Sequence, residues 1–298
     1  MAPTPEDDVQ AGNFRGIFWM LGATLVFVFM HASIRHIARD VNPLEIAFFR
    51  NVLGFVFLAP VFLRYGLTPL RTTRFRLHFW RAVINLINMV TFYIGLRLTP
   101  LAEATALNFT APLFATLLAT VFLGEKVRLR RTLALAIGFT GAIVIVRPGF
   151  AALNPGALFV IFSATLWGGI MVSIKIMSRT DSSLTITLWV LILMTIMSFP
   201  PALFVWQWLT AVQLGWLAFI AVTGTIGQLM LAQALKEAEA TSILPIDFFR
   251  LIWAAVTGYF AFGEVPDLFT WIGGIMIFAS ATYIAFREKK LHRARESR

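Results

Sequence analysis

Long apolar segments separated by short polar ones run along the chain from residue 14 to residue 286. Each is about 16 to 23 residues long, close to the ~20 residues that a helix needs to cross the ~30 Å hydrocarbon core of a bilayer. Many of the breaks between them carry proline, glycine or asparagine, which end helices. The pattern therefore predicts ten membrane-spanning helices. Their expected ranges are 14–35, 43–63, 78–98, 102–124, 131–146, 155–177, 184–205, 213–234, 241–262 and 268–286.

The composition also indicates a membrane protein. Hydrophobic residues make up 58% of the 298 residues and charged residues 13%, about half the charged fraction of a soluble domain. The net charge of +10 does not point to nucleic acid, because the basic residues lie in short loops between apolar segments. We count 19 Lys and Arg on one side of the predicted spans and 4 on the other. This bias predicts an inner-membrane protein with both tails, 1–13 and 287–298, in the cytoplasm.

A short sequence frame occurs twice and defines two halves. One copy begins with Ala102-Glu103-Ala104-Thr105 and ends with Gly124-Glu125, and the other begins with Ala238-Glu239-Ala240-Thr241 and ends with Gly263-Glu264. The copies divide the spans into five-helix repeats over 14–150 and 151–286. Because five is odd, the second repeat enters the membrane from the opposite face, as in transporters that alternate access to a midplane site. We predict an all-α integral membrane protein with two inverted five-helix repeats (5+5).

The second copy of the frame is longer, with 22 steps between its Thr and Gly against 19 in the first. The surplus falls near Pro245, which removes a backbone donor, and Asp247 and Arg250 follow at a spacing that allows pairing on one helix face. A disturbed helix with ionisable groups at membrane depth indicates a binding site, and Asp247 is a candidate for proton coupling. The alternative is an ion pair that only fixes helix packing. We expect the second copy to be where symmetry gave way to function.

Several motifs resemble a known family. They are Arg50 in the second span, Asn108-x-x-x-Pro112 in the fourth, and the closing Gly-Glu before a basic loop. With ten spans in two inverted halves, the chain resembles the EamA-type exporters of the drug/metabolite transporter superfamily over about 14–286. Its aromatic-rich sequence looks most like the YddG-type aromatic amino acid exporters. The segment from Pro245 to Arg250 departs from that pattern.

The third span carries a polar stripe on one helix face. Arg81, Asn85 and Asn88 share that face with Phe92, and in the repeat register Phe92 corresponds to Gln228 of the eighth span. Polar groups facing lipid are costly, so the stripe should meet protein or a water-filled cavity. Interhelical hydrogen bonding is the structural alternative.

Aromatic and small residues supply further candidates. Trp19, Tyr93 and Trp167, with His31, offer rings that could stack on a substrate, although single aromatics in membrane helices are more often structural. Ala134, Gly138 and Ala142 form a small-residue face, and Gly273 and Gly274 lie in the tenth span; both sets suit close helix packing between the halves or between protomers.

These features predict a secondary transporter that exports amino acids, mainly aromatic and apolar ones, by alternating access. Alternatives are a multidrug or quaternary-amine exporter of the same fold, and a channel-like facilitator. No enzyme, cofactor or metal site is expected, because the chain has no cysteine, four histidines and no nucleotide-binding loop. The expected partners are a small-molecule substrate and the lipid bilayer, with the chain as monomer or homodimer. The predicted substrate-binding residues are Trp19, His31, Asn85, Asn88, Tyr93, Asn108, Trp167, Gln228, Asp247 and Arg250. Arg50, Arg81, Pro112 and Pro245 are predicted to be structural or gating residues, with carboxylate binding as the alternative for Arg50.

Overall fold

The computed structural model describes residues 5–65, 70–123, 129–148, 154–177, 180–238 and 244–296. Every element in this part of the chain is a helix. The predicted frame residues Gly124-Glu125 and Glu239-Ala240-Thr241 lie outside the described residues.

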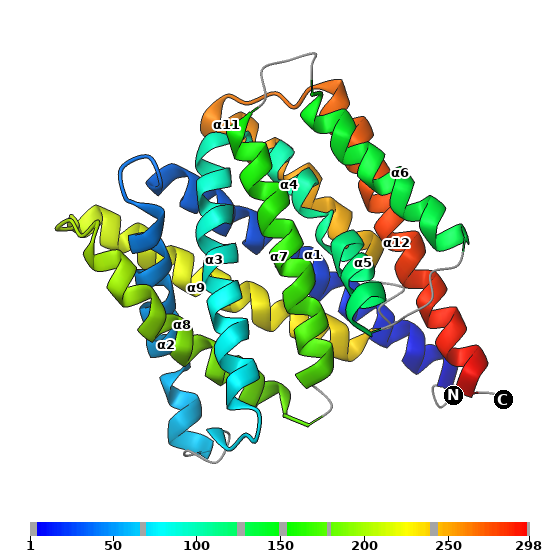
Figure 1. The fold of residues 1–298 in the computed structure, drawn as a ribbon, viewed down its shortest axis with the longest axis horizontal. Helices are drawn as coiled ribbons and strands as arrows, with labels where there is room; N and C mark the ends of the chain where they lie inside the picture. The colour runs from blue at the N-terminus through cyan, green and yellow to red at the C-terminus, as the bar shows by residue number, and fades with distance from the viewer. Residues whose placement is uncertain are drawn as a thin grey trace.

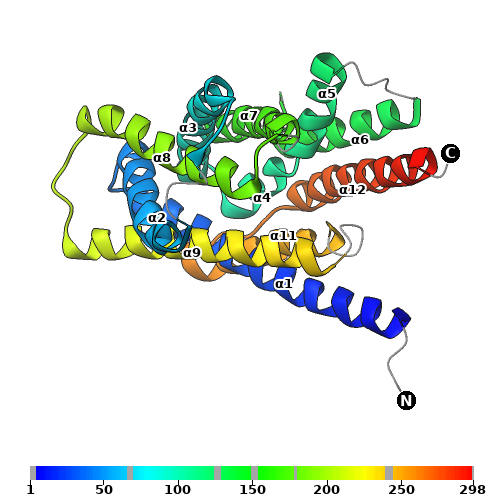
Figure 2. The ribbon, with the colours of Figure 1, turned by 90° about the horizontal axis from the view of Figure 1, so that it is seen from below.

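The helices follow the predicted spans closely. The first half contains α1 (Pro5–Ile37), α2 (Pro43–Tyr65), α3 (Phe75–Leu98), α4 (Leu101–Asn108), α5 (Ala111–Leu123) and α6 (Leu129–Val146). The second half contains α7 (Pro155–Met177), α8 (Ser183–Leu203), α9 (Ala211–Glu237), the 3-10 helix η2 (Leu244–Phe248), α11 (Phe249–Phe262) and α12 (Leu268–Glu296). Eight described segments are long and apolar enough to cross a membrane. The start of α1 and the end of α12 lie on the same side in Figures 1 and 2.

The helices pack in a pattern that repeats when the two halves are exchanged. Figure 2 shows two layers, with α3 and α7 in one and α1 and α9 in the other. Helix α1 packs along α9, and its counterpart α7 packs along α3. Likewise α2 contacts α9 while α8 contacts α3, and the pairs α2–α8, α4–α11 and α6–α12 each join equivalent helices. This arrangement confirms the predicted fold of two inverted five-helix repeats.

The fourth predicted span, 102–124, is two helices rather than one. Helix α4 ends at Asn108 and α5 begins at Ala111. The cause is Pro112, which has no N–H to donate to the carbonyl oxygen of Asn108 four residues earlier. Beside the break, Thr110 donates both its N–H and its hydroxyl to the Leu107 carbonyl oxygen, at 3.0 and 2.7 Å. The spacing in the Asn108-x-x-x-Pro112 motif therefore places a helix break inside the membrane.

The second copy is also interrupted, at the 3-10 helix that contains Pro245 and Asp247. Both copies are therefore discontinuous, and the interruption of the first copy at Asn108 was not expected from the sequence. Phe109 at the first break and Phe248 at the second pack on the same ring, Phe278 of α12, with centroids 5.8 and 4.9 Å away. The two discontinuities thus share one aromatic contact.

Two of the predicted small residues pack between the halves of one chain. A Cβ atom on Gly138 would lie 2.8 Å from the Ser280 hydroxyl oxygen of α12, and Ser280 donates a hydrogen bond to the Ala134 carbonyl oxygen. One turn along, a Cβ on Gly141 would lie 2.7 Å from the Gly273 carbonyl oxygen. The sequence left open whether these residues pack between the halves or between protomers. In this structure they pack between the halves.

Polar contacts tie the start of α3 to the second half. His78, fully buried, donates from Nε2 to the Asp181 carboxylate at 2.7 Å, and Thr72 donates to the same oxygen at 2.8 Å. Nearby, the Trp189 indole N–H donates to the Leu70 carbonyl oxygen at 3.1 Å. Burial alone raises the pKa of Asp181, but the hydrogen bonds from His78 and Thr72 outweigh burial and hold that pKa below its ordinary value.

We expect Asp181 to make stability fall with acid. A depressed folded-state pKa contributes stability that is complete above the ordinary aspartate value of about 4 and is lost as the pH falls through the lower folded value. Asp181→Asn should lower the melting midpoint at pH 7 by about 2–6 °C and flatten its fall between about pH 5 and pH 3. Thermal unfolding in detergent measures this, with Asp40→Asn, at an exposed carboxylate, as control. An unchanged acid profile in the Asp181 variant would contradict the assignment.

Candidate functional site

Arg50 lies about 10 Å into the bundle, seven residues after the start of α2. Its Nη1 donates to the Met89 sulfur of α3 at 3.3 Å, and its Nε is buried without a hydrogen-bond partner. On the α9 side the guanidinium reaches the backbone, because a Cβ on Gly224 would lie only 3.5 Å from Nη2. Within the described residues, Arg50 forms no ion pair. A half-buried cation whose one described hydrogen-bond partner is a thioether sulfur is available to an anion.

Polar and aromatic side chains surround this cation. His31 of α1 is 8% exposed and meets the Phe92 ring of α3 edge-on, with centroids 5.1 Å apart. His31 interacts electrostatically with both Arg50 and Arg250, and Tyr93, 3% exposed, interacts with Arg50. The structure therefore brings the predicted residues His31, Tyr93 and Arg250 together around Arg50.

The second half contributes an ion pair from its interrupted helix. Arg250 Nη2 lies 2.7 Å from Asp247 Oδ1, as the spacing predicts, and the Arg250 guanidinium lies over the Phe27 ring at 5.3 Å. Since Asp247 neutralises Arg250, the net positive charge of this group resides on Arg50. We call the set Phe27, His31, Arg50, Met89, Phe92, Tyr93, Asp247 and Arg250 the central cluster. Sequence reasoning missed Phe27 and Met89, whose apolar types gave no signal.

Two residues of the polar stripe contact α8 instead. Asn85 donates to the Met194 sulfur at 3.2 Å, and Arg81 donates to the Ile186 carbonyl oxygen at 3.0 Å, so both bind α8. This contact matches the structural alternative for the polar stripe. Trp19 packs beside a small core cluster that includes Met20. Five further predicted residues are half-buried or exposed, namely Asn88 and Asn108, which are half-buried, and Pro112, Gln228 and Pro245, which are exposed. Trp167 is 36% exposed.

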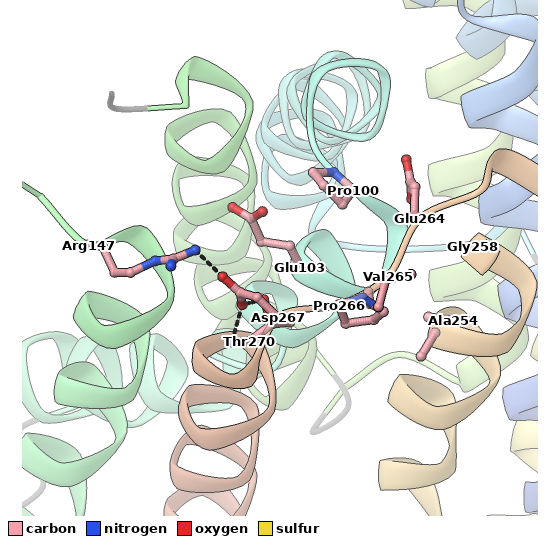
Figure 3. Close-up of a pocket in the computed structure, with 12 residues that line it drawn as sticks. Pro100, Glu103, Arg147, Ala254, Gly258, Glu264, Val265, Pro266, Asp267 and Thr270 are labelled. Atoms are coloured by element: carbon pink, nitrogen blue, oxygen red, sulfur yellow. Dashed lines mark hydrogen bonds and ion pairs between the residues drawn. The ribbon is translucent and has the colours of Figure 1, made fainter. Parts of the chain in front are cut away.

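A separate pocket of about 240 Å³ lies where α4 meets α11 and the start of α12 (Figure 3). Glu103 points into it from α4, while Glu264 and Asp267 come from the segment between α11 and α12. Two ion pairs join the halves around this pocket, Arg35 with Glu264 and Arg147 with Asp267. We call it the mouth pocket.

The repeated frame could have predicted the mouth pocket. Its first copy opens with Glu103, and its second copy closes with Glu264. Because the repeats are inverted, the opening of one copy and the closing of the other lie at the same end of the bundle. These two glutamates therefore face the same space, although they stand at opposite ends of their copies in the sequence.

The chemistry that these side chains support is binding. Among the described residues, no group of three or more His, Cys, Asp or Glu side chains could hold a metal ion. The central cluster offers a cation, a neutralised ion pair and four aromatic rings, counting His31. This set suits a small molecule with a carboxylate and an apolar or aromatic body.

Curated relatives span nearly the whole chain. An S-adenosylmethionine uptake transporter of Rickettsia prowazekii is 27% identical over 95% of this chain and 97% of its own. A riboflavin transporter of Rhizobium johnstonii is 29% identical over 93% of each chain. A pseudopaline exporter of Pseudomonas aeruginosa is 25% identical over 92% of this chain and 97% of its own. The chain is a multi-pass membrane transporter of small molecules and not an enzyme.

Structural and family comparisons agree with these relatives. A solved structure described as "Crystal structure of protein" superposes with a TM-score of 0.58 at 17% identity, covering 97% of this chain and 99% of its own, and so shares the fold. The EamA-like transporter family matches twice, over residues 14–147 and 154–286. With each half matched separately, the chain belongs to the EamA-like transporter family.

Proposed function

We propose that this transporter carries amino-acid-type metabolites that bear a carboxylate and a flat ring, by alternating access to the central cluster. The single observation that carries the proposal is Arg50, a half-buried guanidinium without a carboxylate partner among the described side chains. In a low-dielectric site, a substrate carboxylate would supply the missing charge through charge-assisted hydrogen bonds. The rings of Phe27, Phe92 and Tyr93 would contact the body of the substrate.

The names of the relatives support this choice of substrate class. S-adenosylmethionine has both features, an amino-acid carboxylate and an aromatic base, whereas riboflavin carries a flat aromatic ring system without a carboxylate and supports the ring alone. The aromatic amino acids suggested by the YddG-type resemblance have the same two features in a smaller molecule. We therefore place phenylalanine and tryptophan first among the substrates to be tested, with S-adenosylmethionine and riboflavin beside them.

Export, the direction that the sequence favours, is part of this proposal. The relatives are named for uptake as well as for export, so flux must be measured both ways. An inverted-repeat fold exposes one central site to each face in turn, and the gradient can then set the direction. Proton coupling through Asp247 is a further part of the proposal. In this structure Asp247 is paired with Arg250.

The two alternative functions make different predictions. A quaternary-amine exporter needs unpaired carboxylates near its substrate, whereas the central cluster has its one carboxylate, Asp247, paired with Arg250. A channel-like facilitator would show flux that does not saturate. The central cluster favours the carboxylate substrate over the quaternary amine.

Counterflow in proteoliposomes tests the proposed function. Vesicles loaded with unlabelled phenylalanine, tryptophan, S-adenosylmethionine or riboflavin should accumulate the matching labelled compound, and the rate should saturate with concentration. Phenethylamine, which lacks the carboxylate of phenylalanine, should compete poorly. Absence of saturable exchange for phenylalanine, tryptophan and S-adenosylmethionine, even if riboflavin is exchanged, or equal competition by phenethylamine, would refute the proposal. Empty vesicles and tetramethylammonium serve as controls for leakage and for the quaternary-amine alternative.

A further inference from the structure

One carboxylate joins the two interrupted helices at the mouth pocket. Helix α11 ends at Phe262 and is capped by Gly263, whose φ of +69° lies in the left-handed region that favours glycine. The turn closes with Glu264 N–H donating to the Gly258 carbonyl oxygen at 3.1 Å. It directs the Glu264 side chain back across the boundary between the halves, where Oε2 accepts from the Leu101 N–H at 2.9 Å. Leu101 is the first residue of α4, so Glu264 caps that helix from the other half.

The same carboxylate is held by a cation from a third helix. Arg35 of α1 donates from Nη2 to Glu264 Oε1, and from Nη1 to the Leu96 carbonyl oxygen of α3 at 3.3 Å. Its guanidinium also lies over the Phe262 ring at 5.1 Å. Both oxygens of Glu264 are therefore used, and both partners, Arg35 and Leu101, belong to the first half.

This contact lies directly above the central cluster. Arg35 follows His31 by four residues, one helical turn along α1. Helix α4 is only eight residues long, about 12 Å, and its other end is the break at Asn108. Helix α11 likewise ends, at its other end, in the interrupted segment that carries Asp247. Helices α4 and α11 therefore connect Glu264 with the depth of the central cluster.

We propose that Glu264, bound to Arg35 and to the start of α4, is the latch that closes the path between the central cluster and this face of the membrane. The proposal rests on the alternating-access part of the proposed function. While Glu264 stays bound to Arg35 and to the start of α4, α11 is held against α4. When Glu264 is released, the two interrupted helices separate and the mouth pocket extends toward the central cluster. The Arg147–Asp267 pair is a peripheral contact, because its side chains are 34% and 39% exposed against 10% and 18% for Arg35 and Glu264.

Thiol labelling tests the latch without any substrate. The chain has no cysteine, so one introduced residue reports alone. Ala254 of α11 lines the mouth pocket and is 0% exposed, so Ala254→Cys should react slowly with a membrane-impermeant maleimide. Adding Glu264→Gln or Arg35→Gln should raise the labelling rate about tenfold, because each removes one partner of a buried ion pair. The reagent is applied to vesicles of each orientation, and the increase should appear from the face of the mouth pocket only.

Two controls separate opening from unfolding and from general loss of charge. Ala82→Cys reports from a residue of α3 that is also 0% exposed, near the opposite end of the bundle, and its labelling should stay slow in both latch variants. Asp267→Asn should leave Ala254→Cys labelling within about twofold of the parent, as expected for an exposed pair. Unchanged labelling of Ala254→Cys in both latch variants would overturn the latch, even if counterflow succeeds. Faster labelling together with failed counterflow would support the latch and refute only the substrate assignment.

Discussion

Arg50→Gln should reduce counterflow of a carboxylate substrate by about 30-fold or more, which is the effect of losing roughly 2 kcal/mol of a desolvated charge interaction. The half-buried guanidinium has Met89 as its hydrogen-bond partner, and no described carboxylate pairs with it. Removing it leaves the substrate carboxylate without a counter-charge in a low-dielectric site. Arg50→Lys keeps the charge but loses the planar fork, so it should recover part of the activity.

A double-mutant-type cycle isolates the contact between Arg50 and the substrate carboxylate. The protein is changed by Arg50→Gln, and the ligand is changed from phenylalanine to phenethylamine. In the parent protein, phenethylamine should compete far more weakly than phenylalanine, and in Arg50→Gln the two should compete about equally. Arg97→Gln removes an exposed arginine of α3 and should preserve the parental preference. If Arg50→Gln kept that preference too, Arg50 would be a packing residue, the role first assigned to it from sequence.

Gly141→Ala should destabilise the protein by about 1–3 kcal/mol, although alanine ordinarily favours a helix over glycine. A methyl group there would lie 2.7 Å from the Gly273 carbonyl oxygen and 2.9 Å from the Met276 Cβ. Neither α6 nor α12 can accommodate it without separating, because the nearest atom belongs to backbone. The change should appear as a lower melting midpoint of the detergent-solubilised protein.

Gly215→Ala supplies the matched control. Gly215 lies in α9 and has open space around it, with no atom within 4 Å of an added Cβ. There the helix propensity of alanine should dominate, and stability should rise by about 0.5–1 kcal/mol. If both substitutions changed stability in the same direction, the explanation that Gly141 allows α6 and α12 to approach closely would be wrong.

Periodicity and short motifs predicted the fold well because lipid imposes a simple rule, that an apolar stretch of sufficient length forms a helix. Within the described residues, each of the ten predicted spans coincides with one helix or with an interrupted pair. The break at Asn108 was missed although the motif that causes it was seen. Its four-residue spacing is what deprives the Asn108 carbonyl of a donor, and we used the spacing only as a family marker.

The central cluster was harder to predict from the sequence, for a physical reason. His31, Tyr93 and Arg250 were named from their residue types, but which of the polar residues converge depends on helix rotation, which sequence does not specify. Asn85 and Arg81 turn to α8 instead, where they meet a sulfur and a carbonyl oxygen. The partners at the mouth pocket were missed because Arg35 and Glu264 are 229 residues apart and joined only by the inversion.

The contacts that Glu264 makes with the first half have an evolutionary consequence. After a gene duplication, the two copies of a repeat are usually free to diverge independently. Here Leu101, the residue before the first frame, donates its backbone N–H to Glu264 at the close of the second, and Arg35 of the first half pairs with the same carboxylate. Because this ion pair takes one side chain from each half, a substitution of Arg35 or Glu264 must be answered in the other repeat. Paired substitutions across the two halves, rather than within one, are therefore the pattern by which lineages of this fold could retune how readily one face opens.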